Sequence, residues 1–522
     1  MPLERLWSGR NDADISAMPL LLALDFGTGG VRAGVFDAET RALRGQGEAP
    51  YPTSHPKPGW AEQSMEDWQR AATIAVRAAT AAAGSRAIAG MSIAATAATV
   101  VAARRDGAPL RPALLWMDCR AALEAAATAK VEHPVLAYSG GGDMAEWGTP
   151  KAMWLAAHEP EVYRDADVIC DAIDVMNFRL TGRWVGSRLN ATCKWNYDPL
   201  AKRFAPELFK AFGVPDLIDK LPPDIIGVGE PIATLSAEAA EALGLETRPL
   251  LAQGGIDAHI GMLGSGTVAP GSLMMIGGTS NVHLAHAAKQ LDAPGAWGPY
   301  PNALVDGLWV VEGGQASAGS VLTWLSERIF GLDAAGFAAL LSEASARPVG
   351  AGGLIVLDYW MGNRTPYRDP NLRGAILGLS LWHDRAAIYR AAVEAVAFGS
   401  LAIVDTLQQA GVAIDRFVLA GGVCKNPLWL KTTVDALGLP ARVAGEENLS
   451  LRGAAASAAT ALGLFPGLVE AADAFATPTR LLEPDPAAHA RYRDLFALYR
   501  EATAAAAPIS HRLAQLARQG EA

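Results

Sequence analysis

The sequence predicts an α/β protein made of two lobes of similar fold, and three observations support this. Two segments about 250 residues apart, 21–37 and 273–286, each read as a strand, a Gly-rich turn and a second strand. Strand and helix patterns alternate through residue 257. The length of 522 residues exceeds one ordinary domain. The repeated hairpin therefore favours two lobes that share a similar fold.

Four parts are predicted along the chain. Residues 1–19 carry scattered charges without a long apolar core, which predicts a disordered or tag-like extension rather than a signal peptide. Residues 20–266 form the first lobe, and 267–480 the second. Residues 481–522 are Ala/Arg-rich and predict a helical tail without a role in the chemistry.

The first lobe begins with three short strands, predicted over 21–26, 31–37 and 41–49. A helix follows over 65–83, with a cap region at Ser64. Much later, a strand over 249–253 leads through a Gly-Gly pair to Asp257. The carboxylate of Asp257 is therefore expected at a strand end.

The second lobe opens near residue 268 with the repeated hairpin. An apolar strand is predicted over 352–358 and another over 416–420. Long apolar patterns predict helices over 386–410 and 428–437. This order again alternates strands and helices.

Both hairpin turns have the composition of a phosphate-binding loop. Glycine lets backbone N–H groups approach phosphate oxygens, and Thr28 adds a hydroxyl donor. Asp25, at the end of the first strand, is placed to hold a divalent cation against those phosphates. One such hairpin is more often plain structure, but two favour a nucleotide held between lobes.

Composition excludes several other classes of protein. A net charge of −10 without a Lys/Arg-rich run does not predict a nucleic-acid surface. No apolar run reaches membrane-spanning length, so no membrane partner is expected. The four cysteines are scattered, which predicts reduced thiols and a cytoplasmic protein.

Six motifs together resemble the FGGY carbohydrate kinase family, in its ribulokinase-like branch. They occur in the family's order, and the resemblance covers about residues 20–464. They are Asp25-Phe-Gly-Thr-Gly-Gly-Val-Arg32, Trp116-Met-Asp-Cys-Arg120, Lys151-Ala-Met-Trp-Leu155, Gly255-Ile-Asp-Ala-His259, Gly277-Gly-Thr-Ser280 and Ala420-Gly-Gly-Val-Cys-Lys-Asn426.

This resemblance implies two ribonuclease-H-like domains of the actin/Hsp70/sugar kinase type flanking a cleft. It implies ATP and Mg²⁺ as cofactors and in-line transfer of the γ-phosphoryl group to a primary hydroxyl of a small sugar. Asp257 falls on the family's catalytic base, whereas alone it would read as a turn residue or helix cap. Asp25 and Asp257 are the implied metal ligands.

The same resemblance implies the nucleotide-binding residues. Gly30 stands where the family has a hydroxyl residue, which removes one side-chain donor from the first turn. The phosphates are expected at Thr28, Gly29, Arg32, Gly278 and Thr279, the adenosine at Gly421, Gly422 and Asn426, with further contacts from Gly319 and Thr323.

For the sugar, the resemblance implies contacts from Lys194 and Glu312 and a less polar wall at Ala97. The expected substrate is a pentulose such as ribulose. A xylulokinase-like enzyme and an erythritol- or ribitol-type polyol kinase are alternatives, and a non-catalytic ATP/sugar-binding sensor is an alternative of another class. The oligomeric state stays open, with a homodimer as the one assembly considered.

Two further groups of residues are interpreted as structural. His259, His283 and His286 lack the spacing of a zinc site on one helix, which indicates structural or solvated histidines. Asp118 and Arg120 are expected to pair with each other or with neighbours and to position the site wall.

Overall fold

The computed structural model describes residues 19–445 and 448–520. The chain divides into two compact units, each assembled from segments far apart in sequence. Unit 1 contains residues 19–268, 300–310 and 448–477. Unit 2 contains residues 269–299, 311–445 and 478–520.

These units differ from the continuous ranges expected from the sequence. The expected boundary after residue 266 lies near the observed division after Val268. Residues 448–477, expected in the second lobe, belong to unit 1 because their helices pack on its sheet. The tail is helical, as α16 (Pro486–Gly520) shows. Residues 1–18 of the expected extension lie outside the described residues.

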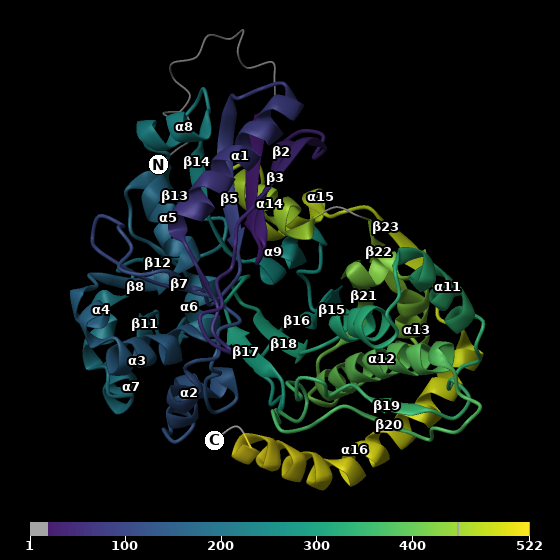
Figure 1. The fold of residues 1–522 in the computed structure, drawn as a ribbon. Helices are drawn as coiled ribbons and strands as arrows, with labels where there is room; N and C mark the ends of the chain where they lie inside the picture. Colours follow the sequence, from purple (N-terminus) through teal and green to yellow (C-terminus); the bar gives the residue numbers. More distant parts are fainter. Residues whose placement is uncertain (1–18, 446–447, 521–522) are drawn as a thin grey trace. The chain divides into compact units, whose positions relative to one another are not determined.

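Unit 1 is built on a six-stranded mixed sheet, drawn in purple to teal in Figure 1. Its order is β13-β14-β5-β1-β2-β3, where β1, β5 and β14 run parallel and the others antiparallel to their neighbours. The strands are β1 Leu20–Phe26, β2 Gly30–Asp37, β3 Leu43–Pro50, β5 Ile88–Ala95, β13 Pro231–Thr234 and β14 Leu250–Ile256.

Helices α1 (Met65–Ala83) and α14 (Leu449–Ala461) cover opposite faces of this sheet. A Cβ added at Gly47 would meet the backbone of α1, whereas one added at Gly34 would meet Leu451 of α14. Gly47 lies opposite Ala33, and side chains alternate along a strand, so Ala33 and Gly34 face different sides. The core that includes the buried face of α1 is made mainly of aliphatic side chains, together with Met65 and Trp68.

The closest helix contact of unit 1 is between α14 and α9 (Asp257–Gly264). A Cβ at Gly453 would lie 1.9 Å from the carbonyl oxygen of Ile260, and one at Gly264 would lie 2.0 Å from that of Leu449. Only glycine permits such an approach. The two helices therefore meet backbone to backbone.

Unit 1 also contains a four-stranded sheet of order β4-β7-β6-β8 and short helices. These elements are β4 Glu62–Gln63, β6 Val100–Ala103, β7 Ala113–Leu114, β8 Val168–Asp171, α2 Ala122–Thr128, α3 Gly148–His158, α4 Pro160–Asp165, α5 Ala172–Thr181, α6 Arg188–Lys194, α7 Pro206–Ala211, α8 Ala237–Leu243 and α15 Leu468–Phe475.

Unit 2 is built on a seven-stranded sheet of order β17-β18-β16-β15-β21-β22-β23. Its long helix α12, in green in Figure 1, packs with α11, α13 and β19. The elements are β15 Gly271–Gly277, β16 Asn281–Ala287, β17 Trp297–Pro301, β18 Trp309–Gln315, β19 Ile355–Leu357, β20 Ala375–Leu377, β21 Ile414–Gly421, β22 Ala441–Ala444, β23 Thr479–Leu482, α10 Gly319–Thr323, α11 Ala334–Ser345, α12 Arg385–Gln409 and α13 Pro427–Leu437.

The two large sheets share one topology. In each, a hairpin (β1–β2 or β15–β16) is followed in the sheet by two parallel strands and then by an antiparallel one. The two lobes of similar α/β fold expected from the repeated hairpin are therefore present.

Three predicted strand boundaries are wrong for local reasons. The third strand begins at Leu43 rather than residue 41, because Arg41 has a φ of 60° and cannot continue a strand. The strand expected over 352–358 is confined to β19, because Gly352 and Gly353 have positive φ. By contrast, β14 continues through Gly254, whose Cβ would lie 1.7 Å from the carbonyl oxygen of Ile93.

One helix in the described part of the chain is long and apolar enough to cross a membrane by length and composition, namely α12. In this protein 94% of its most apolar window is buried. Its apolar character is that of a core helix.

Gly453→Ala is expected to destabilise the protein by about 1–3 kcal/mol, because the new methyl group overlaps the backbone of α9. In an ordinary helix interior the same change would stabilise by about 1 kcal/mol, so the sign of the effect is informative. Urea unfolding of both proteins measures it. A variant as stable as the wild type, or more stable, would contradict the close contact.

Candidate active site

Two carboxylates stand at the same edge of the unit 1 sheet. Asp25 is the sixth residue of β1, and Asp257 directly follows β14. Both strands pair with β5 in parallel, and Asp25 and Gly255 lie opposite the same residue, Ala94. Neighbouring strands are about 4.8 Å apart, so the two strand ends are separated by about 10 Å.

Asp25 is buried and held by two side chains. Arg32 Nη1 donates to its Oδ2 at 3.1 Å, and Asn448 Nδ2 donates to the same oxygen at 2.6 Å. Burial raises the pKa of Asp25, while the bonds from Asn448 and Arg32 oppose this rise. The guanidinium of Arg32 is half exposed, so it can also face a ligand.

Asp257 is the first residue of α9 and is partly exposed. Its Oδ1 accepts from the N–H of Ala258 at 2.7 Å, and its carbonyl oxygen accepts from Ser450 Oγ at 3.0 Å. Burial and the charges of Asp25 and Asp257 raise the pKa of Tyr51. The Tyr51 hydroxyl therefore interacts electrostatically with both carboxylates.

The turn after β1 is braced by groups from three other places in unit 1. Gln63 Nε2 donates to the carbonyl oxygen of Thr28 at 2.7 Å, and Trp116 Nε1 donates to Thr28 Oγ1 at 3.0 Å. The hydroxyl of Tyr51 donates to the carbonyl oxygen of Gly27. Because Trp116 occupies an acceptor position on Thr28, the hydroxyl proton of Thr28 can point toward a ligand. Gly29 follows with open space around its Cα.

The predicted sugar residues of unit 1 lie in the loop after β5 and at the end of α6. Ala97 lies two residues after β5, and Lys151 Nζ donates to the carbonyl oxygen of Ala98 at 2.9 Å. Lys194 ends α6, is buried, and has its Nζ 5.0 Å from the centre of the Trp147 ring. Burial lowers the pKa of Lys151 to about 7. Lys151 is thus a structural lysine beside the Ala97 loop.

Unit 2 holds the second turn, Gly277–Asn281, mainly through backbone and hydroxyl groups. Gly277, at the end of β15, lies opposite Gly421, whose φ is 87° and whose Cβ would lie 2.6 Å from the carbonyl oxygen of Gly277. The N–H of Gly319 donates to the carbonyl oxygen of Gly278 at 2.9 Å. Ser320 Oγ donates to that of Thr279 at 2.8 Å. The turn is therefore clamped at both ends.

The other predicted nucleotide residues of unit 2 lie beside this turn or after β21. Thr323 is exposed at the end of α10, one helical turn after Gly319. Gly422 begins the short helix after β21. Asn426 caps α13 through its Oδ1 and donates from Nδ2 to the Tyr389 hydroxyl at 3.3 Å. It is thus the N-cap of α13, and its contact with adenosine stays a prediction.

Glu312 is buried on β18. Gln315, three residues later on the same strand, belongs to a buried polar network. Asn281 Nδ2 donates to Gln315 Oε1 at 2.8 Å, and Gln315 Nε2 donates to Asp358. The hydroxyl of Tyr499 on α16 donates to the other oxygen of Asp358. The network joins the last residue of the second turn to the C-terminal helix, for which the sequence predicted no role.

The residues interpreted as structural are placed as follows. Arg120 Nη2 bonds Asp118 at 2.7 Å, as predicted, and also Glu62 at 2.8 Å. His259, His283 and His286 are all buried, so the solvated alternative is wrong for them. No group of three His, Cys, Asp or Glu side chains suited to a metal occurs within residues 19–445 and 448–520.

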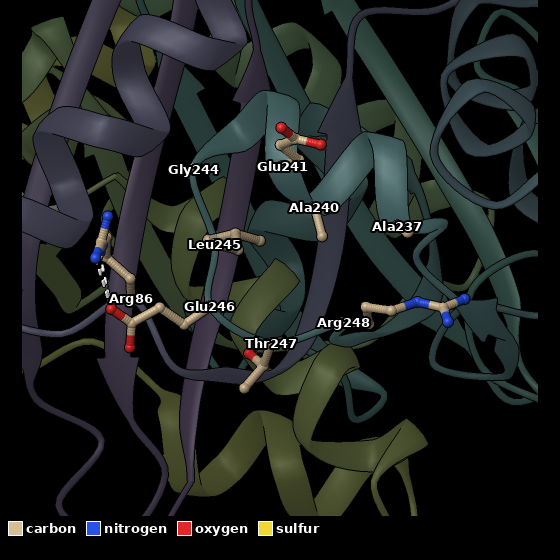
Figure 2. A pocket seen from close by; sticks show the side chains of 9 residues that line it. All are labelled: Arg86, Ala237, Ala240, Glu241, Gly244, Leu245, Glu246, Thr247 and Arg248. Carbon is tan, nitrogen blue, oxygen red and sulfur yellow. Dashed lines mark hydrogen bonds and ion pairs between the residues drawn. The ribbon is translucent and has the colours of Figure 1, made fainter.

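A pocket of unit 1 lies elsewhere, around α8 and the segments that precede β5 and β14 (Figure 2). It includes Arg248 and the ion pair between Arg86 and Glu246, whose atoms are 2.7 Å apart. Since β5 and β14 are parallel, their starts lie at the edge opposite to Asp25 and Asp257. This pocket contains none of the predicted site residues.

Comparison with known proteins agrees with the motifs. Profiles of the FGGY family of carbohydrate kinases match the N-terminal domain over residues 20–264 and the C-terminal domain over residues 273–462. The chain belongs to the FGGY family of carbohydrate kinases. This FGGY kinase is therefore an enzyme that transfers phosphoryl groups to sugars, and the predicted family is confirmed.

Relatives of this FGGY kinase carry several names. It is 32% identical over 437 residues to a ribulokinase from Mycolicibacterium smegmatis, with 78% of this chain and 77% of the other covered. It is 30% identical over 515 residues to an FGGY carbohydrate kinase domain-containing protein from Xenopus laevis, covering 89% and 92%. A solved xylulose kinase from Rhodospirillum rubrum has a TM-score of 0.83 at 27% identity, covering 94% and 100%.

Several residues that shape the site of this kinase were missed at the sequence level. Tyr51, Gln63 and Asn448 contact the first turn or Asp25 from distant parts of the chain. Trp116 was recognised only as the first residue of one family motif. Asn448 precedes an Ala-rich helix, which signals a cap but not a contact with Asp25.

His283 gives a pH-dependent prediction. Burial lowers its pKa from 6.5 to about 4, so between these values the unfolded chain binds a proton that the folded protein does not. The contribution of His283 to stability is therefore nearly constant above about pH 7.5 and becomes less favourable as the pH falls through 6.5 toward 4. The slope approaches about 1.4 kcal/mol per pH unit.

His283→Gln removes this titration. The difference between the two free energies of unfolding, wild type minus variant, should therefore decrease as the pH is lowered from 6.5 to 4.5. It should stay nearly constant between pH 7 and 8. Urea unfolding at these pH values measures it, and a difference that does not change with pH would contradict a neutral buried histidine.

Proposed function

We propose that this FGGY kinase transfers the γ-phosphoryl group of ATP to a primary hydroxyl of a pentulose resembling ribulose. The observation that carries the proposal is the placement of Asp25 and Asp257 at one edge of three parallel strands, next to the turn that contains Thr28. The ribulokinase relatives, at 31–32% identity, support the substrate class.

Asp257 is proposed as the general base that accepts the proton of the sugar hydroxyl. It is partly exposed at a helix start, so a hydroxyl can approach its carboxylate. A positioned base contributes about 10²–10⁴-fold to a rate. Removing the proton makes the sugar oxygen a nucleophile for the γ-phosphorus as the β–γ bond breaks.

Asp25 and Asp257 are also proposed to hold Mg²⁺ together with the nucleotide phosphates. Mg²⁺ in nucleotide sites is commonly bound by one or two carboxylates, phosphates and water, and two carboxylates at one sheet edge fit that donor set. When bound, Mg²⁺ neutralises charge on the phosphates.

The phosphates are proposed to bind the two clamped turns. Thr28, Gly29 and Arg32 supply donors from unit 1, and Gly278 and Thr279 supply donors from unit 2. Arg32 can stabilise charge on the transferred group, since its guanidinium is half exposed. The nucleoside is proposed near Gly319, Thr323, Gly421, Gly422 and Asn426.

Lys194 and Glu312 are proposed to bind sugar hydroxyls, and Ala97 to form part of the wall. Lys194 is buried and Glu312 is buried, so each would hydrogen-bond a ligand away from bulk water. A cytoplasmic location is proposed as well, because the four cysteines are thiols and form no disulfide.

A substrate panel tests the function. Ribulose, xylulose, ribitol, xylitol and erythritol are each supplied with Mg²⁺ and ATP, and ADP release is measured. A ketopentose, with ribulose first, is expected to give the highest kcat/KM. Xylulose as the best substrate would support the xylulokinase alternative, and a tetritol or pentitol would support the polyol kinase. ATP binding without turnover on any of them would contradict the proposal.

Asp257→Asn is expected to lower kcat by about 10²–10⁴-fold with little change in stability, because the amide keeps the shape and loses the base. The matched control is Asp333→Asn at the start of α11, where the side chain likewise bonds the helix backbone. Steady-state kinetics and thermal unfolding compare the variants. Near-normal turnover of Asp257→Asn would refute its assignment as base.

A further inference from the structure

A short segment at the start of α14 contacts both carboxylate residues of the proposed site. Asn448 Nδ2 donates to Asp25 Oδ2 at 2.6 Å, and Ser450 Oγ donates to the carbonyl oxygen of Asp257 at 3.0 Å. Asn448 is 423 residues from Asp25 in sequence. Two residues of one helix start thus reach the ends of both β1 and β14.

The side-chain amide oxygen and nitrogen of Asn448 make contacts with different partners. Its Oδ1 accepts from the N–H groups of Ser450 and Leu451, at 2.9 and 3.2 Å, and so caps α14. Its Nδ2 is consequently directed away from the helix, toward Asp25. The orientation of the amide is fixed by the helix, because only the oxygen can accept from backbone N–H groups.

The carboxylate of Asp25 is oriented by these contacts. Both of its donors, Arg32 and Asn448, address Oδ2, and among the residues that the structure describes none donates to Oδ1. Arg32 is half exposed and long, whereas Asn448 is part of a packed helix. The bond from Asn448 is therefore the more rigid of the two constraints.

We propose that Asn448 is a positioning residue for phosphoryl transfer, which holds Asp25 with its Oδ1 directed toward the cation and the phosphates. The inference rests on the proposed function, because it needs Asp25 to serve as a metal ligand. Groups that orient metal ligands typically change metal affinity or activity by about 10–100-fold when they are replaced.

A neutral donor suits this position. A lysine here would bring a second positive charge and weaken the attraction of Asp25 for a cation, whereas an amide orients the carboxylate and leaves its charge in place. The support behind Asn448 is stiff, because α14 meets α9 through Gly453 and Gly264 without intervening side chains. Placement of Asp25 is thereby tied to the element that carries Asp257.

Two substitutions separate the cap from the contact with Asp25. Asn448→Ser keeps a good N-cap but lacks the N–H group that reaches Asp25. Asn448→Asp keeps the cap as well and places a second carboxylate against Asp25. Asp333→Ser at the start of α11 is the matched control, since it changes a cap of the same kind on a helix that carries none of the proposed site residues.

For Asn448→Ser we expect kcat to fall about 10-fold and the half-saturating Mg²⁺ concentration to rise about 10-fold, with the KM for the sugar unchanged. Asn448→Asp should lower kcat further. Calorimetric titration with Mg²⁺·ADP, without sugar, should show binding weakened about 10-fold in both, and Asp333→Ser should match the wild type. If Asn448→Ser unfolds at a lower urea concentration than the wild type, the kinetics and Mg²⁺·ADP affinity of Asn448→Asp decide whether the inference holds.

Wild-type Mg²⁺ dependence and Mg²⁺·ADP affinity in both Asn448 variants would overturn the inference. Asp25→Asn and Asp257→Asn are measured alongside to separate this failure from that of the proposed function. If those two variants lose activity while the Asn448 variants do not, only the role of Asn448 is wrong. If they too remain active, the site assignment itself fails.

Discussion

The contact of α9 with α14 is the constraint on which the geometry of the unit 1 site depends. Glycine at positions 264 and 453 lets the two backbones touch, and any Cβ there would overlap a carbonyl oxygen. Because α9 begins at Asp257 and α14 begins just after Asn448, their crossing fixes where both helix starts lie at the sheet edge. The same edge receives Asp25 from β1.

The two units stabilise their Gly-rich turns by different means. In unit 1, side chains of Gln63, Trp116 and Tyr51 bond the turn after β1. In unit 2, the turn after β15 is bonded mainly by backbone and hydroxyl groups of residues 318–320, and its last residue, Asn281, joins a buried network. A shared topology therefore places the turns, and unrelated local contacts make them rigid.

Much of the fold and part of the site could be predicted from sequence because they depend on local patterns. The helix over 65–83 was predicted with its observed bounds, because the cap region at Ser64 marks its start in the sequence. Asp25 and Thr28 were found because strand, turn and strand are contiguous. The start of the strand predicted over 41–49 was wrong, because Arg41 adopts a left-handed conformation that its residue type does not signal.

What sequence could not reveal are contacts between segments distant along the chain. Nothing in the sequence around residue 448 indicates that its amide reaches Asp25, because the contact depends on where a whole helix docks. Nor does the composition of the tail indicate that Tyr499 bonds Asp358, since burial of both groups follows from the packing of α16. Such contacts become visible only once the sheets and helices are assembled.

Unit 1 is consequently not a continuous half of the chain, although its sheet is complete by Ile256. A chain that ended at Val268 would expose the face of β1 and β5 on which α14 packs, leave Gly264 without its helix partner, and deprive Asp25 of the donor closest to it. Residues after 447 thus supply contacts that complete the site whose first carboxylate lies on β1. In this kinase the carboxylate edge is assembled only when the chain returns to unit 1 after most of unit 2 has been made.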